Sequence, residues 1–157
     1  MKIKLLAIGK TDDKNLNTLI TTYQNRLKHY VKFDLEIIPD IKNVKNLSES
    51  QQKEKEGELI LKKLQPTDQL ILLDEKGKDF RSLEFANYLQ KKMNSGIKQL
   101  VFVIGGPYGF SEAIYKKSMG KVSFSKMTFS HQMIRLFVVE QVYRAFTILK
   151  NEPYHHE

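Results

Sequence analysis

Residues 100–104 are all apolar, and most are β-branched or aromatic; the run stops at Gly105 and Gly106. A short apolar run bounded by glycines predicts a buried strand followed by a loop. Ser111 is then the predicted N-cap of an amphipathic segment. The stretch therefore predicts the order strand, loop, helix.

The rest of the chain repeats this alternation. We expect further strands at residues 3–8, 33–37, 70–73 and 122–124, and helices over residues 12–29, 48–64, 83–93, from 112 and from about 131. Five strands alternating with helices predict an α/β fold with a mostly parallel sheet covered by helices on both faces. A chain of 157 residues is expected to form a single domain over residues 1–157.

Two local patterns add detail to this prediction. Asp-Glu-Lys-Gly at residues 74–77 predicts a tight turn at the carboxyl end of the strand 70–73. In the helix 48–64, Leu59, Ile60 and Leu64 mark the inner face. The lysines and glutamates of that helix are expected to form a solvated surface.

The composition limits the cellular setting. The sequence contains no cysteine, which excludes disulfides and thiolate chemistry and fits a reducing cytoplasm. The apolar run at residues 3–8 is too short for a signal peptide, and no segment approaches the length of a membrane span. We therefore expect a cytoplasmic protein.

The charge points toward a polyanionic partner. Lys and Arg number 26 against 18 Asp and Glu, which gives a formal net charge of +8 and a pI near 9.5. Such a balance is typical of proteins that bind nucleic acid. Because the lysines are scattered and form no arginine-rich arm, a generally lysine-rich proteome is an equal alternative.

Two loops are the first site candidates. Ligands of open α/β sheets collect beyond the carboxyl ends of the strands, where glycines let a ligand approach the backbone. The loop 105–109 fulfils this condition. The almost uncharged turn 125–130, before the last helix, can offer backbone N–H and C=O groups to a flat, partly neutral ligand.

The last helix is apolar on two sides. One stripe comprises Ile134, Phe137, Val138, Val142, Ala145 and Leu149, and a second comprises Leu136, Val139, Tyr143 and Phe146. One stripe can pack on the sheet, and the other predicts a homodimer with this helix in its interface. A deeper core within one chain is the alternative.

Motifs for other chemistries are absent from the sequence. There is no Gly-x-Gly-x-x-Gly and no Walker sequence, and Pro107 removes one N–H from the glycine loop. His155 and His156 are adjacent and lack metal-ligand spacing, so no metal is expected. A Ser-His-acid triad stays open, although there is no Gly-x-Ser-x-Gly elbow.

Four motifs together closely resemble the RlmH family: Ile-Gly-Gly-Pro-Tyr-Gly at 104–109, Phe-Ser-Lys-Met-Thr-Phe at 124–129, Glu-Gln-Val-Tyr-Arg-Ala-Phe at 140–146, and Pro-Tyr-His at 153–155. These proteins are SPOUT-class methyltransferases that methylate the N3 nitrogen of a pseudouridine in large-subunit ribosomal RNA. The resemblance runs the whole length, including Ala-Ile-Gly-Lys at 7–10 and Lys-Glu-Lys-Glu-Gly at 53–57.

The resemblance implies a SPOUT fold with a deep trefoil knot in its C-terminal part, in which S-adenosylmethionine binds. By matching motifs, the cofactor pocket should comprise Leu73, Gly105, Phe124, Ser125, Lys126, Met127, Thr128 and Phe129. It also implies a homodimer in which the tail of one subunit completes the pocket of the other.

The same resemblance suggests roles for three residues. Arg144 would bind RNA or the target base, Tyr154 would stack on or orient that base, and His155 would accept or relay its imino proton near neutral pH. From the residues alone, Arg144 could instead form a helix-surface ion pair, Tyr154 a packing contact and His155 an idle chain end. His131 is expected to be structural.

Other functions remain open at this point. The nearest is a SPOUT enzyme that methylates transfer RNA or another ribosomal position. The next is a basic RNA-binding protein without catalytic activity, and a nicotinamide oxidoreductase is third. Because each subunit offers little RNA-binding surface, we expect the ribosomal RNA substrate to be part of a structured ribosomal particle.

Overall fold

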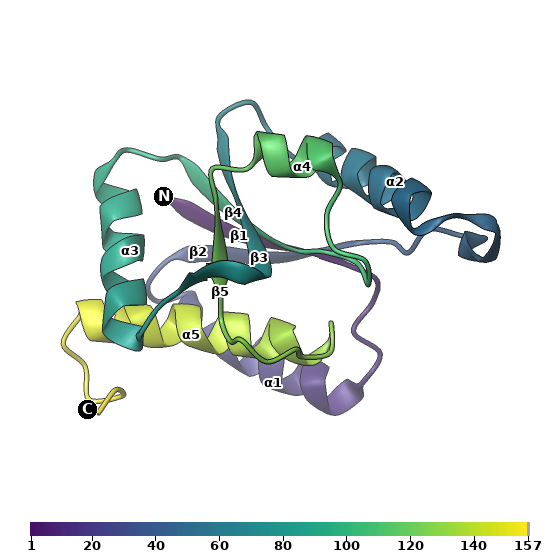
Figure 1. Ribbon diagram of the computed structural model, residues 1–157. Helices are drawn as coiled ribbons and strands as arrows, with labels where there is room; N and C mark the ends of the chain where they lie inside the picture. The colour runs from purple at the N-terminus through teal and green to yellow at the C-terminus, as the bar shows by residue number, and fades with distance from the viewer. Residues whose placement is uncertain (157) are drawn as a thin grey trace.

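Five parallel strands form one sheet in the order β2-β1-β4-β3-β5 (Figure 1). The structure is a computed structural model, and it describes residues 1–156. The strands are β1 (Lys2–Ile8), β2 (Lys32–Ile38), β3 (Asp68–Asp79), β4 (Gln99–Ile104) and β5 (Gly120–Ser123). The parallel α/β fold predicted from the alternation is confirmed. The knot stays a prediction.

The described residues form five α-helices, three of which begin at side-chain caps that the sequence provides. They are α1 (Lys14–Leu27), α2 (Glu49–Lys62), α3 (Ser82–Asn94), α4 (Glu112–Lys117) and α5 (Met133–Leu149), with a short 3₁₀ helix, η1, at Val44–Asn46. Asp13 caps α1 by accepting bonds from two backbone N–H groups, and Ser111 caps α4 by accepting one from Ile114. Ser48 and Gln51 form a reciprocal capping box at α2.

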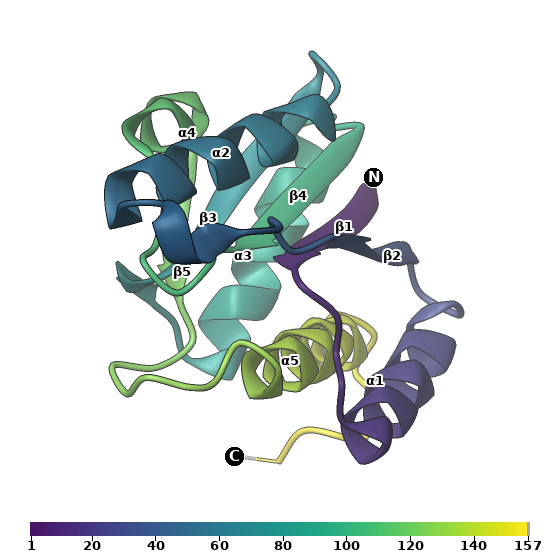
Figure 2. The same ribbon diagram turned by 90° about the vertical axis from the view of Figure 1, so that its right-hand side faces the viewer.

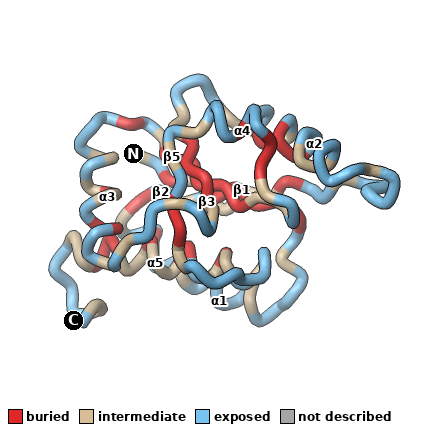
Figure 3. The backbone as a smooth tube through the Cα atoms, viewed as in Figure 1, coloured by how far each residue is buried: buried red, intermediate tan, exposed pale blue. Residues whose placement is uncertain are grey.

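The helices form two layers around the sheet. Helices α2 and α4 cover one face, and α1, α3 and α5 cover the other (Figure 2). The central strand β4 alternates between the two cores, since Phe102 joins the α1/α3/α5 side while Val101 and Val103 join the α2/α4 side. Burial is therefore concentrated in the sheet (Figure 3). Full burial of one such side chain contributes about 2 kcal/mol.

The turn predicted at residues 74–77 is wrong, because β3 continues to Asp79. Val122 of β5 pairs with Leu73 and again with Lys78, so the intervening residues bulge out of the ladder. A Cβ on Gly77 would lie 2.6 Å from the carbonyl carbon of Val122, so only glycine allows this approach. Asp74 does accept a turn-like bond from the N–H of Lys76, at 2.8 Å. The local turn chemistry is present, but pairing with the distant β5 carries the strand past it.

The prediction for α2 also needs a correction. Ile60 is buried as expected, but Glu56, which was placed on a solvated surface, is only 4% exposed. The neighbouring Gly57 lets α2 approach α4 closely, since a Cβ there would lie 2.5 Å from the Ser111 hydroxyl. This close approach removes Glu56 from solvent.

Both apolar stripes of α5 are largely buried by contacts within the same chain. Val138, Val142 and Ala145 are buried, and so are Val139 and Phe146 of the second stripe. The second stripe is covered by α1 and the residues after it: Tyr143 lies against Tyr23, with ring centroids 5.8 Å apart, and Phe146 lies 6.4 Å from Tyr30. The single-chain alternative therefore explains the stripes, and they do not by themselves require a second copy. Met133 and Phe137 remain exposed, at 39% each.

Candidate active site

A cavity of about 440 Å³ opens at the carboxyl ends of β3, β4 and β5. It is lined by Leu73, Asp74, Glu75, Lys76, residues 104–110, Tyr115, residues 122–125, residues 127–129, His131 and Ile134. The size is in the range of small-molecule sites, which hold mostly apolar walls with a few polar groups. Both loops predicted as site candidates contribute to it.

The glycine loop is a tight turn that forms one wall of the cavity. The N–H of Gly109 donates to the carbonyl of Gly106 at 3.1 Å, and Pro107 occupies the second position of the turn. Gly109 has a φ of +81°, which a residue with a side chain rarely adopts. At Gly105, a Cβ would lie 3.1 Å from the ring of Phe110. The glycines therefore fix the shape of this wall.

The turn after β5 forms the opposite wall and is held by serine hydroxyl groups. The Ser123 hydroxyl donates to the carbonyl of Ser125 at 2.8 Å, and the Ser125 hydroxyl accepts from the N–H of Met127 at 2.8 Å. Met127 is 76% exposed at the mouth of the cavity. These bonds order the turn, while its apolar side chains stay free to contact a ligand.

The predicted cofactor residues come together in this cavity, with one exception. Leu73, Gly105, Phe124, Ser125, Met127, Thr128 and Phe129 all line it. Lys126 lies outside, and its Nζ atom is 3.8 Å from the carboxylate of Asp79. Whether these residues bind a cofactor stays a prediction.

Acidic residues at the rim were missed by the sequence analysis. Asp74 accepts a bond from the Tyr115 hydroxyl at 2.9 Å, and Glu75 accepts one from the Thr128 hydroxyl at 3.3 Å. Burial, together with the bond to Asp74, raises the pKa of Tyr115 to about 12, so its phenol stays protonated. These carboxylates can receive hydroxyl or cationic groups of a ligand. Their position directly after a buried strand was the available signal.

The first turn of α5 is fixed beneath the cavity by a buried arginine. Arg135 donates to the carbonyl of Ile8 at 2.7 Å and to the Thr11 hydroxyl at 2.8 Å. This ties the start of α5 to the loop after β1. His131, expected to be structural, lies just before this anchored turn and lines the cavity.

A second hollow, of about 330 Å³, adjoins the first. It is lined by Phe80, Phe85, residues 122–125, Phe129, Phe137 and Gln141, and it shares the end of β5 with the cavity. Phe129 and Phe137 lie 4.9 Å apart at its edge. The surface beside the cavity is therefore aromatic and partly open.

Arg144, Tyr154 and His155 also come together, but at the far end of α5. The Glu140 carboxylate accepts from Arg144 at 2.7 and 3.1 Å and from the Tyr154 hydroxyl at 3.1 Å. The guanidinium of Arg144 lies 4.7 Å from the centre of the Tyr154 ring. The Tyr154 hydroxyl is also 3.3 Å from that of Tyr23 on α1. We call these residues, with His155, the tail cluster.

The protonation states within the tail cluster are constrained. Burial raises the pKa of Tyr154, as do its contacts with Tyr23 and Glu140, so its phenol remains a donor at neutral pH. Nη1 of Arg144 lies 3.3 Å from Nδ1 of His155. Because a guanidinium only donates, Nδ1 is the acceptor in this contact.

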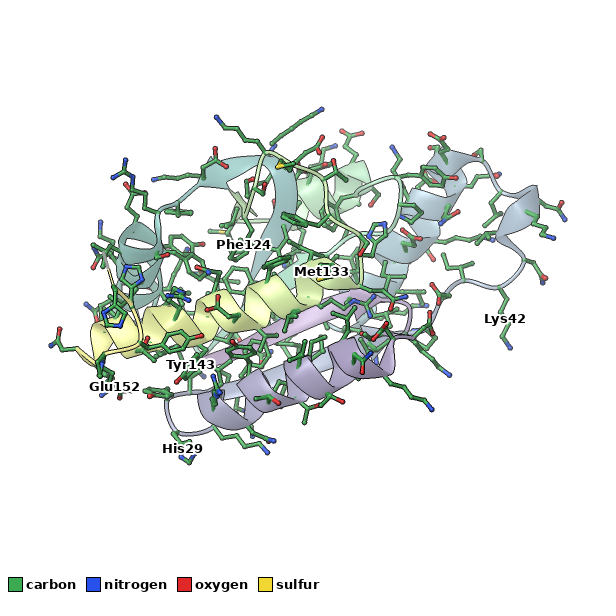
Figure 4. All side chains as sticks on the ribbon, turned by 90° about the horizontal axis from the view of Figure 1, so that it is seen from below. His29, Lys42, Phe124, Met133, Tyr143 and Glu152 are labelled. Atoms are coloured by element: carbon green, nitrogen blue, oxygen red, sulfur yellow. The ribbon has the colours of Figure 1, made fainter. Side chains whose placement is uncertain are left out.

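The cavity and the tail cluster are separated along α5. Figure 4 shows Met133 at the start of the helix and Glu152 beyond its end. Ile134 lines the cavity, and Arg144 follows ten positions later, which corresponds to about 15 Å along a helix. One chain therefore holds the two groups of predicted site residues apart.

Residues 1–156 contain no group of three or more His, Cys, Asp or Glu side chains placed to hold a metal ion. No helix in this part of the chain is long and apolar enough to cross a membrane.

Comparison with known proteins gives first the class and then the family. A family model described as "Predicted SPOUT methyltransferase" matches residues 1–155, so the parallel fold and its carboxyl-end cavity are those of a SPOUT methyltransferase. Relatives from Flavobacterium psychrophilum and Flavobacterium johnsoniae are 75% and 76% identical over the full length of both chains, and one from Parabacteroides distasonis is 68% identical over the same span. Each is named ribosomal RNA large subunit methyltransferase H. The chain belongs to the RlmH family, as its motifs indicated, and membership implies a methyl donor.

Proposed function

We propose that the chain transfers a methyl group from S-adenosylmethionine to the N3 nitrogen of a pseudouridine in large-subunit ribosomal RNA. The observation that carries this proposal is full-length identity of 75% to a protein named as a large-subunit ribosomal RNA methyltransferase. The position on the base follows from the family resemblance of the motifs. The net charge of +8 fits a polyanionic substrate.

The cavity suits the proposed cofactor. Apolar side chains such as Leu73 and Phe124 can enclose the adenine, and the glycine loop allows close approach of the backbone. Asp74 and Glu75 can accept bonds from ribose hydroxyls or the amino group, and their charge complements a sulfonium. When bound, the cofactor supplies an already activated methyl group. The protein's task is then to place the base nitrogen in line with that group and to remove its proton.

The active site is proposed to be composite, with the cavity from one chain and the tail cluster from a second copy. The separation along α5 supports this, because neither Arg144 nor His155 lines the cavity of its own chain. The exposed Met133 and Phe137, beside the aromatic hollow, offer an apolar surface on α5 for such a partner. A homodimer through this helix would thus complete each cavity.

Within this site, Arg144 would contact RNA or the target base, and Tyr154 would orient that base. Both are ordered by Glu140, which holds them in one hydrogen-bonded group. His155 is assigned to the imino proton. The ion pair and the packing contacts seen in the chain are compatible with these roles, because they pre-organise the two side chains.

The test is methyl transfer from labelled S-adenosylmethionine to ribosomes that lack this modification, with the product located by mass spectrometry. We expect label at N3 of a large-subunit pseudouridine and weaker labelling of short naked RNA, since the substrate is proposed to be a ribosomal particle in the cytoplasm. Label on transfer RNA, or at another ribosomal position, would favour the alternative substrate. Failure to bind the cofactor would favour a non-catalytic RNA-binding protein.

A further inference from the structure

Glu56 is a buried carboxyl group that the proposed function does not use. It belongs to α2, which covers the face of the sheet opposite α5, and it is 4% exposed. Its Oε1 atom accepts from the Gln52 side chain at 2.9 Å, but its buried Oε2 atom has no hydrogen-bond partner. A buried carboxyl oxygen without a partner is destabilising, so its presence calls for an explanation.

The carboxyl group of Glu56 packs against the glycine loop from behind. A Cβ on Gly106 would lie 2.6 Å from both Cδ and Oε1 of Glu56, and Oε2 would be closer still. The next residue, Gly57, makes the matching contact at the other end of the loop, where a Cβ would meet the Ser111 hydroxyl at 2.5 Å. Helix α2 therefore supports both ends of the segment that forms one wall of the cavity.

Two charged or titratable groups from elsewhere in the fold face Glu56, namely His131 and Asp40, which follows β2. Burial raises the pKa of the Glu56 carboxyl group, the hydrogen bond from Gln52 and the charge of His131 lower it, and Asp40 raises it. His131 lines the cavity, whereas Glu56 does not. Glu56 thus lies behind the wall and acts on a ligand only through the loop.

We propose that Glu56 is a positioning residue of the cofactor site, whose carboxyl group holds the turn at Gly106 in the shape that binds the cofactor. The inference rests on the proposed function, because it assumes that the cavity binds S-adenosylmethionine. Glu56 would thus contribute to cofactor binding from α2, on the face of the sheet opposite α5. The space occupied by the carboxyl group also explains why position 106 has no side chain.

The test uses the full chain and measures the Kd for S-adenosylmethionine by calorimetry, with the melting temperature as a check on folding. Glu56→Gln keeps the shape of the side chain and should bind within about twofold of the unaltered chain, whereas Glu56→Ala should bind about tenfold more weakly. Glu58→Ala, on the exposed side of the same helix, is the matched control and should change nothing.

A double substitution separates contact with Glu56 from contact with the ligand. Gly106→Ala should weaken binding by about tenfold or more, because its Cβ displaces the carboxyl group, and adding Glu56→Ala should recover about fivefold by vacating that space. Should Glu56→Ala not fold, Glu56→Asp withdraws the carboxyl group by one methylene and should give the same rescue.

The outcomes distinguish this inference from the proposed function. Unchanged binding by a folded Glu56→Ala chain, or no rescue of Gly106→Ala, overturns the role of Glu56 while the function stands. If the unaltered chain itself does not bind S-adenosylmethionine, the proposed function fails first.

Discussion

The cavity and the tail cluster are built in different ways. The cavity is formed by loops that leave adjacent parallel strands, so the sheet itself brings Leu73, Gly105 and Phe124 together. The tail cluster is formed by side chains from the end of α5 and the chain beyond it, held by contacts with Tyr23 of α1 and with Tyr30 after that helix. The first encloses a cavity of about 440 Å³, whereas the second is a hydrogen-bonded group of polar side chains. In the proposed composite site, the cavity of one chain therefore needs the tail cluster of a second copy of the chain.

Removal of the tail should have the largest effect. A chain ending at Asn151 lacks Tyr154 and His155, so we expect methyl transfer to ribosomes to fall about 100-fold or more, the usual loss when a proton-transfer group is removed. The Kd for S-adenosylmethionine should stay within about twofold, because the residues lining the cavity are all retained. Transfer at the normal rate by a folded, truncated chain would contradict the roles of both residues.

Mixing two inactive variants should restore activity if the site is composite. Arg144→Ala keeps its cavity and Gly105→Val keeps its tail cluster, so a mixed dimer contains one intact site of two. Random exchange of equal amounts should give about a quarter of the unaltered activity, since half of the dimers are mixed. Mixtures that remain as inactive as the separate variants, despite exchange of subunits, would place each site within one chain.

Two tyrosines allow a matched comparison of the regions. Tyr115 donates to Asp74 at the cavity, and Tyr30 donates to Glu152 at the tail. Tyr115→Phe should weaken cofactor binding about threefold, and Tyr30→Phe should lower methyl transfer about threefold at unchanged cofactor affinity; each loses one hydrogen bond to a charged group. Identical effects of both variants on the cofactor Kd would show that the regions are not separate.

The smallest expected effect is on stability at high pH. The hydrogen bond to Glu152 raises the pKa of Tyr30 from 10.0 to about 12. Because the folded chain favours the protonated phenol, this stability is complete below pH 10 and is lost as the pH rises toward 12. The difference in unfolding free energy between the unaltered chain and Tyr30→Phe should therefore be constant up to pH 10 and shrink above it in urea titrations. A difference that grows above pH 10 would contradict the assignment.

Local patterns account for most of the fold. Residues 100–104 are apolar at every position, which suits only a strand buried on both faces, and β4 is that strand. Asp13, Ser48 and Ser111 supply caps at the predicted starts of three helices. The cavity was predicted for the same reason, because parallel strands carry their following loops to one edge of the sheet.

Contacts between distant segments account for the errors. Residues 74–77 have turn chemistry, but their place in the fold depends on pairing with Val122, far along the chain. Glu56 lies in a helix with the composition of a solvated surface, and only the close packing of Gly57 on Ser111 shows that it is buried. The second stripe of α5 was assigned to a partner, but α1 of the same chain covers it, so the homodimer stays a prediction that this stripe does not carry.

The sequence by itself determined the alternation of strands and helices, the caps, the glycine loop and the family, because each depends on residue types at short, fixed spacing. Only the tertiary structure decided that Asp74 and Glu75 border the cavity, that Glu56 packs behind its wall, and that Arg144 and His155 lie at the other end of α5. These outcomes depend on which segments pack together. Packing is fixed by the burial of the whole chain, and no single stretch of the sequence encodes it.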